Sequence, residues 1–244
     1  MIEIRPVTAH AELQEIVRVQ QLIWGFEDFE LIPLRLFVVA AKIGGQVFGA
    51  FDGKKMAGFC MAIPGLKAGG KSYLHSHMLA VLPEYRNEGV GRTLKLTQRD
   101  DALGRGIDLI EWTFDPLEVK NAFFNLERLG AIVRRYVPNQ YGTTSSPLHG
   151  GLPTDRCIAE WWLASPQVRA IVDGRPLERS TVEVRIAIPS DIAAIKSSDP
   201  QRARAIQQKA SEDFAAAFDR GLAVIGFEKS EQAGTSLLGI WESN

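Results

Sequence analysis

The sequence predicts an α/β protein in which strands alternate with helices and some neighbouring strands form hairpins. The chain has 244 residues, 45% of them apolar and 23% charged, which is the balance of a globular protein. Apolar residues recur with the spacing of helices or of strands over most of the chain. Glycine and proline interrupt these patterns where turns are expected.

The charge and the cysteine content exclude several classes of protein. The chain carries 28 Lys and Arg against 29 Asp and Glu, so the net charge of −1 gives no general reason to bind nucleic acid or an anionic membrane. The first residues lack the apolar segment of a secretory signal, and the longest apolar run, 37–41, is far shorter than the roughly 18 residues of a membrane helix. Cys60 and Cys157 are too few for a disulfide framework or a cysteine metal site. We therefore expect a cytoplasmic protein without nucleic-acid or membrane partners.

Strands and helices alternate over the first part of the chain. The segments that predict strands are 2–5, 46–51, 56–63, 72–81, 107–114, 131–137 and 156–163. Helical spacing follows Thr8, Gly91 and Pro116. Asp52-Gly53 is a strong signal for a hairpin turn between the second and third strands. Residues 25–41 give no clear pattern.

A second, smaller region is expected after residue 163. Its segments predict a strand at 181–188, a helix at 200–220 and a hairpin of 222–228 with 236–242. Val182-Glu183-Val184-Arg185 matches Ile2-Glu3-Ile4-Arg5, although a four-residue match also arises by chance. We expect a first domain over 1–163 and, over 164–244, a strand-helix-strand-strand extension that is a half copy of the N-terminal region.

A glycine-containing turn, Arg86-Asn87-Glu88-Gly89-Val90-Gly91, joins the strand 72–81 to the next helix. A helix that begins directly after such a turn directs unpaired backbone N–H groups and the positive end of its dipole at one spot, which suits a phosphate. A P-loop is excluded because Gly91-Arg92-Thr93 lacks the lysine, and a dinucleotide fingerprint because Leu94 replaces its third glycine. The alternative is that the glycines serve only a tight turn.

This segment resembles the acyl-CoA-binding motif of the GNAT superfamily of N-acyltransferases. The family pattern is Arg/Gln-x-x-Gly-x-Gly/Ala after a strand that ends in Val-x-Pro, and residues 81–91 match every fixed position. The order of elements over 1–163 fits that fold as well. The resemblance implies a mixed, mostly antiparallel sheet flanked by helices, to which 164–244 is added.

The resemblance also implies which residues bind the co-substrate, acetyl-CoA or another acyl-CoA. The N–H groups of the loop would hold the pyrophosphate, and backbone groups near Leu79 and Val81 would hold the thioester carbonyl and the pantetheine arm. The loop residues implied are Arg86, Asn87, Glu88, Gly89, Val90, Gly91 and Arg92. No metal is expected.

One departure from the family concerns the group that protonates the leaving thiolate. GNAT helices often carry a tyrosine four residues before the glycine that matches Gly130, where this chain has Leu126. The asparagine often found earlier is Val119. Tyr136, Tyr141 or solvent could donate the proton instead. A CoA thiolate is a fairly good leaving group, so a dedicated acid is not obligatory.

Two histidines, His75 and His77, lie on the strand before the glycine loop. Alternation with a period of two would put them on one face with Leu79 and Val81. A histidine, with an ordinary pKa of about 6.5, can accept the proton that an ammonium must lose before it attacks a thioester. GNAT enzymes commonly place a base at the first position, and aralkylamine-type members resemble this segment in carrying histidine at both. The alternatives are packing in the core, pairing with Glu111, or a two-histidine metal site.

The sequence thus predicts transfer of an acyl group, acetyl in first place, from acyl-CoA to an amine by direct attack on the thioester. The acceptor would be a small-molecule or amino-acid-like amine, and since GNAT proteins often dimerise, a homodimer is one expected state. The alternative is a non-catalytic CoA-binding module that acts as a sensor or in an interaction. The other histidines, His10 and His149, are expected at the surface, with His149 in a long loop that could also face substrate.

Overall fold

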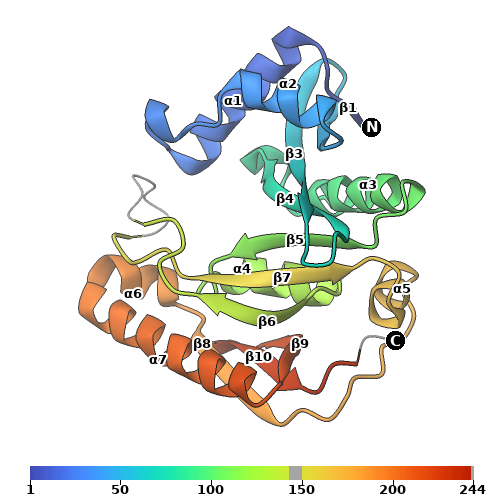
Figure 1. Cartoon of the computed structure of the whole chain (residues 1–244). Coiled ribbons are helices and arrows are strands. Elements are labelled where there is room, and N and C mark those ends of the chain that lie inside the picture. Colours follow the sequence, from blue (N-terminus) through green and yellow to red (C-terminus); the bar gives the residue numbers. More distant parts are fainter. Residues whose placement is uncertain (143–149, 243–244) are drawn as a thin grey trace. The chain divides into compact units, whose positions relative to one another are not determined.

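Strands and helices alternate along the chain, as the sequence predicts (Figure 1). The computed structural model describes residues 1–142 and 150–242. The described chain divides into two compact units, unit 1 with residues 1–111 and unit 2 with residues 112–142 and 150–242. Among the described residues, no helix is both long enough and apolar enough to cross a membrane.

Unit 1 contains an antiparallel sheet in the order β1-β2-β3-β4. Its strands are β1 (Ile2–Pro6), β2 (Gln46–Asp52), β3 (Lys55–Leu66) and β4 (Ser72–Val81). The first half of β5 (Leu109–Phe114) pairs with β4 in parallel, at Leu74–Ile110 and His75–Glu111. The mixed, mostly antiparallel sheet expected from the sequence is confirmed.

Helices cover both faces of the unit 1 sheet. The helices α1 (His10–Trp24) and α2 (Leu34–Lys42) pack with Met61 and Met78 in one apolar cluster. The helix α3 (Val90–Gly104) packs with Cys60 in another. Short 3₁₀ turns, η1 (Asp28–Glu30) and η2 (Pro83–Tyr85), lie before α2 and after β4. The segment 25–41, which the sequence left unassigned, thus holds η1 and most of α2.

Unit 2 has its strands in the order β5-β7-β6-β9-β10-β8. They are β6 (Ile132–Val137), β7 (Arg156–Trp162), β8 (Val184–Pro189), β9 (Ala223–Lys229) and β10 (Ala233–Gly239). The strand β6 pairs antiparallel with β7 and β9, and β10 pairs antiparallel with β9 and β8. Its helices are α4 (Val119–Phe123), continued by the wider turn η3 (Phe124–Arg128), and α5 (Pro166–Val172), α6 (Ile192–Ser198) and α7 (Pro200–Asp219).

The C-terminal extension begins with α5, a helix that the sequence did not predict, and from β8 on it has the chain order of strand, helix, strand and strand, with the helix split into α6 and α7. Asp199 ends α6 and caps α7 by accepting a hydrogen bond from the N–H of Arg202 at 3.0 Å, and Pro200 occupies the first turn of α7. The strand orders of the two regions differ. In the extension β10 lies between β9 and β8, whereas at the N-terminus β2 lies between β1 and β3.

The two regions are therefore alike in the order of these elements along the chain and differ in the order of their strands in the sheet, and the half copy stays a prediction. The two compact units divide at residues 111 and 112. The boundary at residues 163 and 164 follows from the resemblance to the GNAT family, and it stays a prediction.

The neighbouring tryptophans of β7 have different surroundings. Trp161 is fully buried, its ring packs edge-on against Trp112 with centroids 5.9 Å apart, and its indole N–H donates to the carbonyl of Leu129 at 2.6 Å. Trp162 is half-buried and stacks on Trp241 at 6.0 Å. Trp161 is therefore a core residue of unit 2, and its hydrogen-bonded indole fixes the turn before β6.

We expect Trp161→Ala to lower the free energy of unfolding by about 3–5 kcal/mol, because it leaves a large cavity and an unpaired carbonyl. Trp162→Ala, the matched change one residue along the strand, should cost less than about half as much. Urea denaturation of both variants measures the difference. Equal losses would contradict the assignment of Trp161 to the core.

Candidate functional site

The glycine loop has the backbone conformation that its sequence suggests. After η2, residues 86–89 lead into α3, and both Asn87 (φ +65°) and Gly89 (φ +83°) are left-handed. Asparagine and glycine are the residues that adopt this conformation most readily. A Cβ on Gly89 would meet no atom within 4 Å. Glycine is therefore favoured here by the backbone angle and not by lack of space.

The loop can bind an anion through its backbone. Its residues 86–89 are exposed, and the N-cap residue Gly89 offers no side chain to cap α3. The first N–H groups of an α-helix have no partner inside the helix, and they carry the positive end of its dipole. Left-handed residues in a loop also turn neighbouring N–H groups toward one concave spot. A pyrophosphate is the kind of group that this arrangement suits.

The strand β4 carries a β-bulge at His77. Its residues 78–81 pair with β3 so that Met78 lies opposite Met61, but Ser76 lies opposite Ala62. One residue of β4, His77, is therefore extra relative to β3. A bulge of this kind moves the side chains that follow it along the strand to the opposite face of the sheet from the one that strict alternation predicts.

The bulge changes which residues share a face with the histidines. Ile63, the partner of His75, packs with the α1 and α2 cluster, as Met78 does. Leu79 and Val81 instead pack against α3. The prediction that His75 and His77 share a face with Leu79 and Val81 is wrong, because it assumed an uninterrupted alternation through β4.

The backbone of Leu79 and Val81 points away from β3. The N–H of Leu82 donates to the carbonyl of Ala57 at 2.9 Å, and hydrogen-bonded pairs alternate with non-bonded pairs along an antiparallel ladder. In the observed register, Leu79 and Val81 occupy the non-bonded pairs. Their N–H and C=O groups are therefore directed at the other edge of β4. One of them, the carbonyl of Val81, accepts a hydrogen bond from Nε of Arg86 at 3.2 Å.

The two histidine rings are neighbours with different exposure. Their centroids lie 5.9 Å apart, with His75 half-buried and His77 exposed. Desolvation lowers the pKa of His75 to about 4, and the positive charges of His77, Lys95 and Lys67 contribute to this shift. Desolvation also lowers the pKa of His77. Both rings are thus neutral at neutral pH and can accept a proton, which His75 would hold weakly.

Glu111 is the strand partner of His75 on β5, as the alternative interpretation of the histidines requires. Its buried carboxylate lies 2.6 Å from Nζ of Lys67, whose ammonium also lies over the ring of Tyr73 at 4.5 Å. Glu111 is therefore engaged in an ion pair with Lys67. In the part of the chain that the structure describes, no three His, Cys, Asp or Glu side chains are grouped as a metal site would require.

The residues considered as proton donors all belong to unit 2. Leu126 is buried in η3, where the N–H of Leu129 reaches back five residues to Phe124, and it offers no proton. The hydroxyl of Tyr136 donates to Asp155 at 2.6 Å, and burial raises its pKa far above its ordinary value. Tyr141 is exposed, with its hydroxyl 2.9 Å from that of Thr113. Of these three residues, Tyr141 is the one with an exposed side chain. His149 lies outside the described residues.

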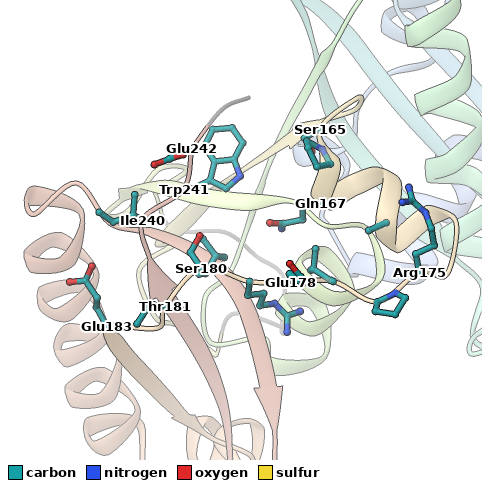
Figure 2. Close-up of a pocket in the computed structure, with 16 residues that line it drawn as sticks. Ser165, Gln167, Arg175, Glu178, Ser180, Thr181, Glu183, Ile240, Trp241 and Glu242 are labelled. Atoms are coloured by element: carbon teal, nitrogen blue, oxygen red, sulfur yellow. The ribbon is translucent and has the colours of Figure 1, made fainter.

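A cavity of about 810 Å³ lies in unit 2, and Figure 2 shows its lining. The segment between α5 and β8, with Arg175 and Glu178, contributes to the lining, as do Gln167 of α5 and Trp241. None of the site residues predicted from the sequence lines it. Trp162 does not line it either.

Comparison with known proteins agrees with the topology. The model of the acetyltransferase (GNAT) family matches residues 12–130. No curated protein matches the chain. Arabidopsis thaliana NAA60 in complex with acetyl-CoA has a TM-score of 0.55 at 15% identity, over 66% of this chain and 98% of that one.

Two further solved structures are similar. The ribosomal-protein-S18-alanine N-acetyltransferase from Escherichia coli has a TM-score of 0.50 at 20% identity, over 66% of this chain and 92% of that one. The aminoglycoside 6'-acetyltransferase type Ii has a TM-score of 0.53 at 18% identity, over 66% and 97%. At such identities the likeness establishes the fold.

The low pKa of His75 predicts how stability depends on pH. Between its ordinary value of 6.5 and its folded value of about 4, the unfolded chain binds a proton at His75 that the folded chain does not. Stability should therefore fall as the pH falls through this window, by up to about 1.4 kcal/mol per pH unit from this group. Urea denaturation at a series of pH values should show a shallower dependence for His75→Gln. An NMR titration midpoint for His75 near its ordinary value would contradict the prediction.

Proposed function

On the premise that residues 12–130 match the model of the acetyltransferase (GNAT) family, we propose that the chain transfers an acyl group, acetyl in first place, from acyl-CoA to an amine. The observation that carries the proposal is the exposed left-handed loop at the start of α3, next to the strand that bears His75 and His77. The loop suits the pyrophosphate of CoA, and the strand supplies groups for the thioester and the amine.

The roles of β4 follow from its backbone. Because the N–H groups of Leu79 and Val81 are directed away from β3, they are available to an extended, amide-rich pantetheine at that edge. An N–H that reaches the thioester oxygen would also stabilise the negative charge of a tetrahedral intermediate. The loop from Arg86 to Arg92 would hold the pyrophosphate through its backbone.

The proposed transfer needs one proton acceptor and one proton source. The amine nitrogen forms a bond to the thioester carbon and gives up a proton, the C–S bond then breaks, and the thiolate takes a proton. We assign the acceptor role to His77 first, because it is exposed and lies at the bulge, with His75 beside it. The thiolate takes its proton from solvent, since Leu126 has none to give.

The second candidate function is a CoA-binding module without catalysis, which Leu126 favours. Thiol release from acetyl-CoA over a panel of small amines and amino-acid-like amines separates the two. Release with any acceptor supports the transferase. Binding of CoA without release on any acceptor supports the module.

We expect CoA to raise the melting temperature, with a stabilisation of about 2.7 kcal/mol at a concentration one hundred times its Kd. Gly89→Asp and Gly91→Asp should abolish this shift, because a carboxylate repels the pyrophosphate and a side chain crowds it. Gly69→Asp is the matched control, since Gly69 has φ +84° and equally open space. It should lose stability in the same way and keep the CoA shift. A full shift in both folded loop variants would exclude the loop.

We expect His77→Gln to lower kcat by about 10²–10⁴, the usual loss of a general base, and His75→Gln to lower it less. The CoA-dependent shift in melting temperature should stay in both variants. In wild type, kcat/KM should rise with pH along a limb that stays fixed when amines of different pKa are compared. The double variant is the strict test, because water can bridge neighbouring histidines. Turnover within about threefold of wild type would show that the proton leaves by another route.

A further inference from the structure

A chain of buried polar groups lies between β4 and α3, where the surrounding side chains are apolar. Nζ of Lys95 donates to Oγ of Ser76 at 2.9 Å, and that hydroxyl donates to Oε1 of Gln98 at 3.0 Å. Lys95 is 2% exposed, Ser76 5% and Gln98 0%. A lysine is rarely buried to this extent, because its ammonium loses its hydration.

The polar chain continues along α3 to the surface. The carbonyl of Gln98 accepts a hydrogen bond from Nε2 of Gln46 at 2.8 Å, and Nε2 also donates to Asp101 at 2.7 Å. Asp101 in turn forms an ion pair with Arg105 at 2.9 Å. Among the described residues, the side-chain Nε2 of Gln98 has no hydrogen-bond partner. Apolar residues would fill this space without that cost, so packing alone does not account for the polar chain.

The polar chain ends at the bulge of β4. Ser76 is the last residue paired with β3 before the extra residue His77, and its neighbour on the other side is His75. We propose that Lys95, acting through Ser76, is a positioning residue that holds the bulge and so sets the placement of His77 and His75. This inference rests on the transferase proposed above, in which those histidines accept the amine proton.

The charges around His75 are consistent with this role. Lys67 follows β3, Lys95 lies on α3, His77 is on β4 and Glu111 is on β5. Desolvation is the main cause that lowers the pKa of His75, and the charges of Lys95 and Lys67 act in the same direction, so that its ring stays in the form that can accept a proton. Burial lowers the pKa of Lys95 itself to about 7.

The test is Lys95→Met, which keeps an unbranched stem of four atoms and removes the amine. Two readouts are used, the NMR titration of the His75 and His77 rings without ligand, and the thiol-release rate. We expect the ring resonances of both histidines to move and the midpoint of His75 to rise by at least about half a pH unit. We expect kcat to fall about 10- to 100-fold through misplacement, with the CoA-dependent shift in melting temperature retained.

Three further variants make the test independent of folding and of the proposed function. Ser76→Ala breaks the same chain without touching the lysine and should act in the same direction, while Ser76→Thr keeps the hydroxyl and should restore the histidine resonances. Lys196→Met is the matched control, because this lysine is also buried but pairs with Asp115 and Glu118. It should leave the His75 and His77 resonances in place.

The outcomes separate the two proposals. Histidine resonances and midpoints that stay unchanged in both Lys95→Met and Ser76→Ala would overturn the positioning role, whatever the activity. A second outcome is that the variants move the histidine resonances while the wild-type protein releases no thiol with any amine. This outcome would support the positioning of the bulge and reject the transferase. If Lys196→Met also lowers the activity and also moves the histidine resonances, the effects reflect a general loss of stability. This outcome would overturn the specific role of Lys95.

Discussion

The site in unit 1 depends on one extra residue in β4. Because His77 has no partner on β3, the side chains before and after it change faces relative to that strand. His75 therefore lies on the side of α1 and α2, while Leu79 and Val81 pack toward α3. The same register directs the backbone groups of Leu79 and Val81 to the edge of β4. One strand thereby offers proton acceptors on one face and hydrogen-bonding groups for an extended ligand at its edge.

The helix α3 serves this strand at both its start and its middle. Its first turn follows the left-handed Gly89 and leaves N–H groups for an anion. One turn further on, Lys95 enters the apolar layer and bonds to Ser76 beside the bulge. The spacing between these features is fixed by the helix itself. The position of the proposed phosphate site along the helix axis is thus coupled to the position of the bulge, and this rigid connection is what the proposed reaction between a bound thioester and a positioned base requires.

Local sequence patterns predicted the strands and the glycine loop. They did not predict features that depend on pairing between distant residues, such as the bulge and the strand order. Residues 72–81 were assigned to a strand with the observed bounds of β4, because apolar and polar residues alternate there. Buried and less buried residues also alternate without interruption across the bulge. The alternation therefore does not reveal that the side chains after His77 lie on the opposite face from the one it predicts. The helix α2 was missed because Leu36, Val38 and Val39 are exposed apolar residues that blur its periodicity. The place of β10 between β9 and β8 arises from pairings between distant residues, which no local pattern contains.

The choice between a transferase and a binding module depends on which of two proton transfers needs a protein group, the one from the acceptor ammonium or the one to the CoA thiolate. An acceptor ammonium must lose its proton before it can attack, whereas a CoA thiolate leaves without much help. The chain reflects this asymmetry. Leu126 and the high pKa of Tyr136 provide no good acid, but two neutral histidines lie together at the bulge. A module that only bound CoA would need the loop and the edge of β4. It would have no use for a buried lysine bonded beside those histidines, and the cost of burying that lysine favours the transferase.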